Sequence, residues 1–211
     1  MAKTLNDLPP RVALVEIARD FHARGWLSGT AGNLSVRADD GNFWITASGR
    51  PKGRLDESDF LLVRIEDGEV VERAAPGITP SAETAIHCAI YALFPEARAC
   101  LHGDSVDGCL VSGRAKRGAK AVRLPAIEML KGFDISRQNP KVDLPLFENL
   151  PDVAKLAAGI GRRLSKSPPA LSALMVRGHG TMVWARSLQE ACNRFECLEF
   201  VLSVAARART R

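Results

Sequence analysis

Apolar positions along the chain follow two spacings, one typical of helices and one typical of strands. The helical spacing is clearest over residues 11–24, where a glycine ends the segment and the apolar positions are Val12, Val15, Ala18 and Phe21. Further helices are predicted over residues 81–93, 105–111, 152–164 and 188–206. Strands are predicted over residues 34–37, 42–46, 60–65, 69–72, 97–101, 121–130, 174–177 and 181–184.

The alternation of these elements predicts one α/β or mixed layered domain over residues 1–211, with a central sheet and helices before, within and after it. The pattern gives no strand order. Ser81 and Ser105 are expected to cap the two helices that begin beside them. Residues 140–151 contain several prolines and are expected to form a connection without regular structure.

Two of the four histidines follow apolar runs, which makes them candidate metal ligands. His102 has Asp104 two residues further on, and side chains at that spacing share one side of an extended chain. His179 lies between two glycines. Two histidines and a carboxylate leave coordination positions open, as catalytic divalent metals require, whereas structural sites are closed by four ligands. The other interpretation is that both are ordinary buried histidines.

The same residues match a second type of metal site. A His-x-Asp pair with a distant histidine is also the iron-binding triad of oxygenases that use 2-oxoglutarate. Those enzymes have a strand-rich barrel between the ligands, whereas this sequence predicts a helix over residues 152–164 between them. The pattern therefore favours a different fold around the metal.

Three short segments have the composition of an anion-binding site. Residues 29–33, residues 48–52 and the cap at Ser81 combine glycines with hydroxyl, amide or lysine side chains. Exposed backbone N–H groups and such side chains stabilise a phosphate, especially near a helix N-terminus. Each segment alone is also typical of an ordinary turn.

Two carboxylates are candidate proton carriers, because a carboxylate beside a metal-bound carbonyl can remove an acidified proton. Glu83 is also in the first turn of a predicted helix, where its charge would complement the helix dipole. Glu128 lies among Ile127, Met129 and Leu130, and a carboxylate in such apolar surroundings suggests a function.

Composition narrows the class of protein. Five cysteines without a CxxC pair indicate free thiols in a reducing compartment, and we expect a cytoplasmic protein with no membrane span. The net charge is +5, but the basic runs at 114–117 and 207–211 are not interleaved with aromatic residues. This charge favours an enzyme acting on anionic substrates over a nucleic-acid-binding protein.

Taken as an ordered set, five motifs resemble the class II aldolase/adducin family: Gly29–Ser35, Thr46–Gly49, Pro80–Glu83, the segment around His102, and Arg177–Gly180. The resemblance extends from Arg11 to Ala206. Within the family the chain is most similar to the bacterial methylthioribulose-1-phosphate dehydratases of methionine salvage. That similarity rests on Lys52-Gly53, Pro80–Thr84, Ser105–Asp107, Glu128 with Lys131-Gly132, and Trp184.

The resemblance implies a three-layer α/β/α fold around a mainly antiparallel sheet, and a homotetramer with active sites near subunit interfaces. It also implies Zn2+ held by three histidines. His102 and His179 match two of these ligands, but Asp104 stands where the family has the third histidine. Because aspartate also ligates iron and manganese, Fe2+ and Mn2+ are alternatives to zinc.

By the same resemblance, the substrate is a sugar phosphate whose phosphate lies among Thr30, Asn33, Ser48, Gly49, Lys52 and Ser81. Glu128 would take the C3 proton beside a polarised C2 carbonyl and assist departure of the C4 hydroxyl as water. The product would be 2,3-diketo-5-methylthiopentyl 1-phosphate.

Two alternatives remain open. One is a sugar-phosphate aldolase or epimerase, in which Glu83 would be the proton carrier. Such aldolases typically use a tyrosine from a C-terminal extension, whereas the one tyrosine here, Tyr91, is expected within a helix. The other is a non-catalytic, adducin-like binding protein, to which the replacement at Asp104 points.

Overall fold

A computed structural model describes residues 4–208. The first three and last three residues of the domain expected over 1–211, including the end of the basic run 207–211, lie outside the described residues. The helices are α1 (Pro10–Ala23), α2 (Thr84–Leu93), α3 (Val106–Arg114), α4 (Val153–Lys166) and α5 (Leu188–Arg207), with short 3-10 turns η1 (Leu5–Asp7), η2 (Lys52–Arg54) and η3 (Glu128–Phe133). The strands are β1 (Asn33–Arg37), β2 (Asn42–Thr46), β3 (Phe60–Arg64), β4 (Val70–Arg73), β5 (Ala99–Gly103), β6 (Ala121–Arg123), β7 (Asp143–Phe147), β8 (Ala173–Val176) and β9 (Thr181–Ala185).

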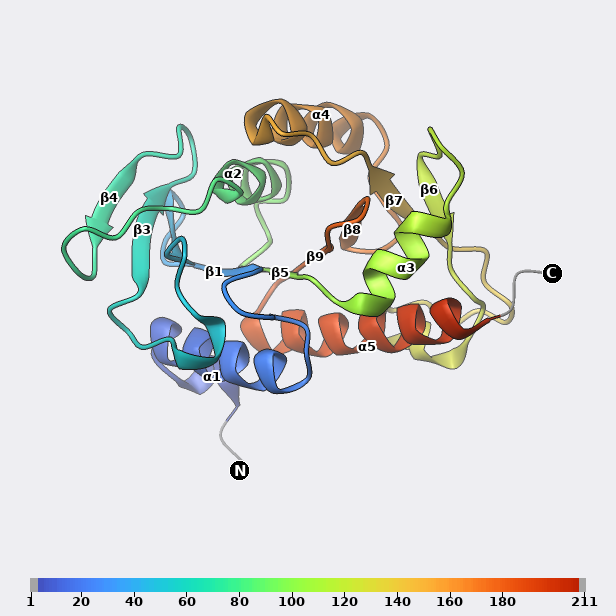
Figure 1. Cartoon of the computed structure of the whole chain (residues 1–211), viewed down its shortest axis with the longest axis horizontal. Coiled ribbons are helices and arrows are strands. Elements are labelled where there is room, and N and C mark those ends of the chain that lie inside the picture. The colour runs from blue at the N-terminus through green and yellow to red at the C-terminus, as the bar shows by residue number, and fades with distance from the viewer. Residues whose placement is uncertain (1–3, 209–211) are drawn as a thin grey trace.

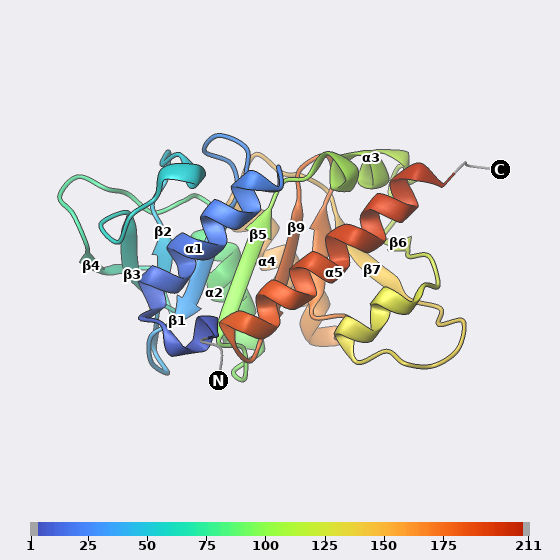
Figure 2. The same cartoon turned by 90° about the horizontal axis from the view of Figure 1, so that it is seen from below.

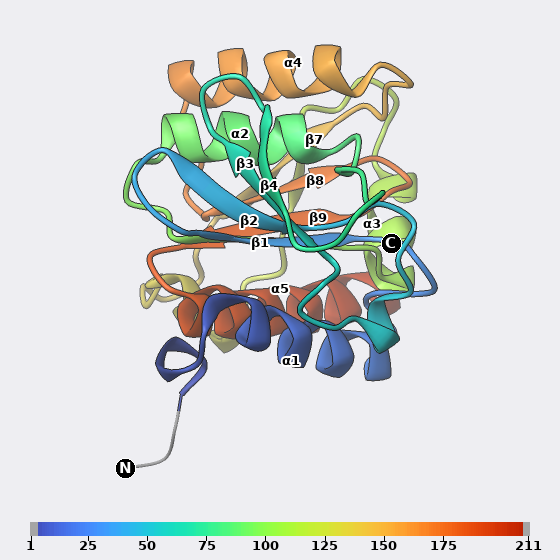
Figure 3. The same ribbon diagram turned by 90° about the vertical axis from the view of Figure 1, so that its left-hand side faces the viewer.

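The strands form one sheet in the order β4-β3-β2-β1-β5-β9-β8-β7-β6, in which β7 and β8 are the parallel pair and the other neighbours are antiparallel. Helices α2 and α4 cover one face, and α1 and α5 cover the other (Figures 1 and 3). The expected three-layer α/β/α fold around a mainly antiparallel sheet is therefore confirmed.

Each face of the sheet has its own apolar core. Residues of α1 and α5 pack on one face around Phe21 and Phe195, whose rings stack with centroids 4.7 Å apart. Residues of α2 and α4 pack on the other face around Ile90 and Ile160. Burial on both faces explains why β1, β5, β8 and β9 are buried along their whole length. None of the helices within residues 4–208 is both long and apolar enough to cross a bilayer.

Two expectations about secondary structure are wrong. The segment 140–151 was expected to lack regular structure, but it contains β7, which joins β6 to β8 despite its proline, Pro145. The extended segment expected over 121–130 ends at Arg123, and Glu128 begins the 3-10 turn η3. Its apolar neighbour Leu130 is buried, whereas the Glu128 side chain faces solvent and pairs with Lys131.

The two expected serine caps differ in outcome. Ser105 caps α3, since its hydroxyl accepts a hydrogen bond from the Gly108 N–H at 3.0 Å. Ser81 does not cap α2, because that helix begins three residues later and Glu83 occupies the N-cap position. The Ser81 hydroxyl instead accepts from the Glu83 N–H at 3.2 Å and forms the turn that leads into the helix.

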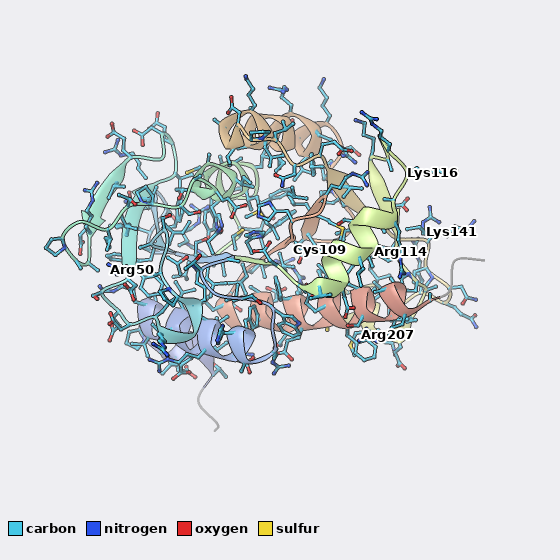
Figure 4. All side chains as sticks on the ribbon, viewed as in Figure 1. Arg50, Cys109, Arg114, Lys116, Lys141 and Arg207 are labelled. Carbon is cyan, nitrogen blue, oxygen red and sulfur yellow. The ribbon has the colours of Figure 1, made fainter. Side chains whose placement is uncertain are left out.

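Basic side chains at one end of the molecule join α3 to α5 (Figure 4). Arg114, at the end of α3, donates to the carbonyl of Ala206 at the end of α5, at 2.6 Å. Arg207 donates to the carboxylate of Asp107, in the first turn of α3, at 3.0 Å. Arg114 therefore provides a hydrogen-bond donor to a carbonyl at the C-terminal end of α5, and Arg207 pairs with a carboxylate in the first turn of α3.

Candidate active site

The register between β1 and β5 brings together residues that are far apart in the sequence. Asn33, the first residue of β1, lies directly opposite His102 near the end of β5. On the other side of β5, His102 pairs with Met182 of β9. The three strands run side by side in the middle of the sheet (Figure 2), so the site is built at the ends of central strands.

The turn between β8 and β9 carries His179 to the same edge. Gly178, the residue before it, has a φ of 58°, a conformation that favours glycine. A Cβ at Gly180 would overlap the carbonyl of Gly103 and the carboxylate of Asp104. Glycines on both sides of His179 therefore allow the turn to approach the end of β5.

Four side chains meet where β5 and this turn end. Glu83 Oε1 lies 3.1 Å from His179 Nε2, and Glu83 Oε2 lies 3.4 Å from His102 Nε2. Asp104 Oδ1 is 3.6 Å from the Nε2 atoms of both histidines. The residues predicted from the His-x-Asp…His pattern are thus brought together, and Glu83 joins them.

The spacing of these atoms fits a first-row metal ion. Ligands about 2.1 Å from a tetrahedral zinc are separated by roughly 3.4 Å from one another, and the four separations above range from 3.1 to 3.6 Å. Among the described residues, His102 Nε2 and Asp104 Oδ1 are buried and have no hydrogen-bond partner. Buried polar atoms normally have one, so the donor set fits a bound cation.

The orientation of His102 is set from its other ring nitrogen. Its Nδ1 donates to the carbonyl of Thr181 at 3.0 Å, which leaves the Nε2 lone pair facing Glu83 and Asp104. The Thr181 hydroxyl in turn donates to Glu199 of α5 at 3.2 Å. Burial raises the pKa of Glu199 to about 7, against hydrogen bonds from Ser105 and Thr181 that lower it.

The sequence did not identify Glu199 as part of the site's surroundings, nor Glu83 as a potential ligand. Glu199 is 3% exposed although it lies in a helix with many charged residues, so no local pattern singles it out. Glu83 was considered as a proton carrier or a helix-dipole partner. Its closeness to both histidines depends on how α2 lies over the sheet, which the sequence does not give.

A cavity of about 260 Å³ opens beside the four side chains. It is lined by all six residues expected to bind phosphate, Thr30, Asn33, Ser48, Gly49, Lys52 and Ser81, together with Glu83, Asp104 and His179. The candidate phosphate pocket therefore shares one cavity with two of the candidate metal ligands, Asp104 and His179.

Lys52 gives this cavity a buried positive charge. The residue is 2% exposed, and its ammonium donates to the carbonyls of Thr30 at 2.8 Å and Arg50 at 3.1 Å. No carboxylate within residues 4–208 forms an ion pair with it. Burial lowers the pKa of Lys52, while the nearby charges of Asp104 and Glu83 raise it. A lysine has three N–H donors, so one remains for an anion in the cavity.

Glu128 does not lie in this cavity. Its side chain is 81% exposed and forms an ion pair with Lys131 at 2.5 Å, which lowers the pKa of Glu128. The turn η3 packs against α5 on the face of the sheet covered by α1 and α5 (Figure 2). Within one chain, Glu83 thus lies with the candidate metal ligands His102, Asp104 and His179, and Glu128 lies outside this group.

Known proteins are similar to this chain in sequence and in fold. The family described as Class II Aldolase and Adducin N-terminal domain matches residues 12–206. The chain belongs to this family. A methylthioribulose-1-phosphate dehydratase of Microcystis aeruginosa is 50% identical over 192 residues, which cover 91% of this chain and 92% of the relative. A dehydratase of the same name from Leptospira biflexa is 38% identical over 201 residues, covering 92% and 95%.

A solved structure extends the comparison to three dimensions. The L-fuculose-1-phosphate aldolase of Thermus thermophilus superposes with a TM-score of 0.70 at 25% sequence identity, covering 92% of each chain. The chain therefore shares both sequence and fold with class II aldolase family members, as its motifs predicted.

Proposed function

We propose that this protein dehydrates 5-methylthioribulose 1-phosphate to 2,3-diketo-5-methylthiopentyl 1-phosphate, a step of methionine salvage. The observation that carries the proposal is the shared cavity, which is lined by the buried Lys52 and by His179 with two carboxylates, next to His102. A sugar phosphate carries a phosphate, which could bind the lysine, and a carbonyl, which could bind a metal at the histidines. The names and high identity of the two dehydratase relatives support this substrate over other sugar phosphates.

Binding of the phosphate is assigned to the end of the cavity formed by Lys52 and the loops around Thr30, Ser48 and Ser81. The Lys52 ammonium is held in place by two backbone carbonyls, so it loses little side-chain entropy when an anion binds. The adjacent hydroxyls supply neutral donors. Anchoring the phosphate there would orient the sugar toward the histidines.

The metal is assigned to His102, Asp104 and His179, with Glu83 as a fourth group. A divalent cation held there would polarise the substrate carbonyl and so acidify the neighbouring C–H bond. Two histidines and two carboxylates form a harder, more anionic donor set than three histidines. We propose zinc, with Fe2+ or Mn2+ as the alternatives that this donor set accommodates.

We assign proton removal at C3 to Glu128 of the partner subunit in a homo-oligomer, which by family resemblance is a tetramer. In the isolated chain Glu128 is exposed and its pKa is lowered by Lys131, so it would be a weak base. Burial between subunits would raise that pKa by removing water from the carboxylate. The same group, once protonated, can return its proton to the departing C4 hydroxyl, which leaves as water.

Mixing two inactive variants tests this assignment. Glu128→Gln removes the base, and His179→Ala removes a metal ligand. If each site combines His179 of one chain with Glu128 of another, random mixed oligomers contain about one quarter of intact sites, and activity returns. If both residues act within one chain, every site keeps a defect and the mixture stays inactive.

The fold also accommodates a sugar-phosphate aldolase or epimerase. In that reaction Glu83, which lies beside His179 in the cavity, would carry the proton. The superposition on an L-fuculose-1-phosphate aldolase is the observation that favours it. Cleavage of a sugar phosphate into two fragments, rather than loss of water, would establish this function instead.

A non-catalytic, adducin-like role is the remaining alternative. It would follow if the purified protein bound no metal after reconstitution with zinc, iron or manganese. The five free thiols support a reducing, cytoplasmic compartment, and we propose that residues 1–211 function as one domain.

A further inference from the structure

A buried chain of polar side chains runs from the core under α2 to the candidate active site. Asn33 and Ser35 lie on the same face of β1. Glu83, the N-cap of α2, is followed at intervals of four residues by His87 and Tyr91 within the helix. Two residues of strand and four residues of helix advance by similar distances, about 6 to 7 Å. The two rows therefore stay in register where α2 lies over the sheet (Figure 3).

The side chains form a continuous series of hydrogen bonds. The Tyr91 hydroxyl lies 2.8 Å from Ser35 Oγ, which lies 2.7 Å from His87 Nδ1. His87 Nε2 contacts the carbonyl oxygen of the Asn33 side chain. The Asn33 amide nitrogen donates to Glu83 Oε2 at 2.5 Å. Tyr91, Ser35 and His87 are at most 1% exposed.

The direction of each bond follows from the Asn33 amide, whose nitrogen donates to Glu83 Oε2 and whose oxygen lies against His87 Nε2. A carbonyl oxygen only accepts hydrogen bonds. The Asn33 carbonyl then faces His87, whose Nε2 must carry the proton. His87 Nδ1 is consequently an acceptor for the Ser35 hydroxyl. Burial lowers the pKa of His87 to about 3, so the ring is neutral and has a single proton to place.

We infer that His87 is a positioning residue that fixes the amide orientation of Asn33, and through it the donors of the proposed phosphate pocket. This inference rests on the proposed function only for the identity of the anion. If the Asn33 amide turned over, it would present its carbonyl oxygen to Glu83 and to the cavity. With the observed orientation, one Asn33 N–H holds Glu83 Oε2 and the second remains for an anion.

A histidine tautomer can be observed directly. In long-range 1H–15N spectra of the full-length protein, the His87→Gln variant identifies the His87 signals by their disappearance. The expected wild-type result is a neutral ring protonated at Nε2. Protonation at Nδ1 would overturn the inference, whether or not the protein has dehydratase activity.

Binding of inorganic phosphate, measured by calorimetry, tests the consequence for the pocket. His87→Phe keeps a ring but removes both nitrogens, and we expect about 10-fold weaker binding or more. His87→Gln can donate to Asn33 and accept from Ser35, so it should bind within about threefold of wild type.

A matched control separates positioning from folding. Ile90→Ala also alters the buried face of α2 but has no polar partner. We expect it to lower the unfolding midpoint without weakening phosphate binding. Equal phosphate affinity in His87→Phe and wild type, equal losses in His87→Phe and Ile90→Ala, or no phosphate binding by the wild-type protein would refute the inference.

Discussion

Glu199 should make the stability of the metal-free protein depend on pH. Its pKa is raised from 4.5 to about 7 by burial. In the unfolded chain the carboxyl ionises near pH 4.5, whereas the folded protein retains the proton until about pH 7. Folding therefore becomes less favourable as the pH rises through this interval. A shift of this size corresponds to about 3 kcal/mol at 1.36 kcal/mol per pH unit.

The substitution Glu199→Gln isolates this contribution, because glutamine is neutral at every pH and has a similar shape. The free energy of unfolding of wild type should fall by about 3 kcal/mol relative to the variant between pH 4.5 and pH 7.5. Urea unfolding followed by tryptophan fluorescence measures it. The titrations need a chelator, since metal binding is itself pH-dependent.

Glu196→Gln is the matched control, because this carboxylate lies on the same helix but is half-exposed and pairs with Arg24. For Glu196→Gln, the difference from wild type in the free energy of unfolding should stay nearly constant between about pH 4.5 and pH 7.5. Parallel pH profiles for wild type and Glu199→Gln would show that Glu199 ionises normally in the folded protein, and the account of its burial would be wrong.

Two further predictions concern the cavity. Lys52→Met should raise KM for a phosphorylated substrate by roughly 30-fold or more, because a buried charge-assisted hydrogen bond is lost, and a change below about threefold would place the phosphate elsewhere. Asp104→His restores the histidine expected from the family and should keep or raise zinc affinity, measured by competition with a chelator. A collapse of zinc binding in that variant would show that the site depends on the carboxylate.

Local sequence patterns were sufficient for most of the fold. Helical spacing located α1 and α5, and short apolar segments separated by turns located β1, β2, β8 and β9. The pattern failed at β7, where Pro145 suggested a connection. This strand nevertheless pairs on both sides, through Leu144 with β6 and Leu146 with β8.

The site was predictable only in part, because several of its contacts depend on strand order and helix placement. His102, Asp104 and His179 were recognisable from their positions after apolar runs. The contacts of Glu83 with the histidines, and of Glu199 with Thr181, arise from tertiary packing between distant segments. Neither contact leaves a periodic signal in the sequence.

For Glu128, the sequence suggested burial that the structure does not show. Its apolar neighbours suggested a buried carboxylate, but a 3-10 turn directs Leu130 and Phe133 into the core and leaves Glu128 in solvent. Within a single chain, Glu128 therefore has no place in the candidate active site. The proposed assembly would give it one, and the mixing experiment tests that proposal.

The central claim is the dehydration of 5-methylthioribulose 1-phosphate, and mass spectrometry of the reaction tests it most directly. Protein reconstituted with zinc, iron or manganese, to about one metal per chain, is incubated with this substrate, with His179→Ala as the control. The account predicts a product lighter by one water, formed by wild type and not by the variant. Unchanged substrate with fully metal-loaded protein, or cleavage into two fragments, would contradict it.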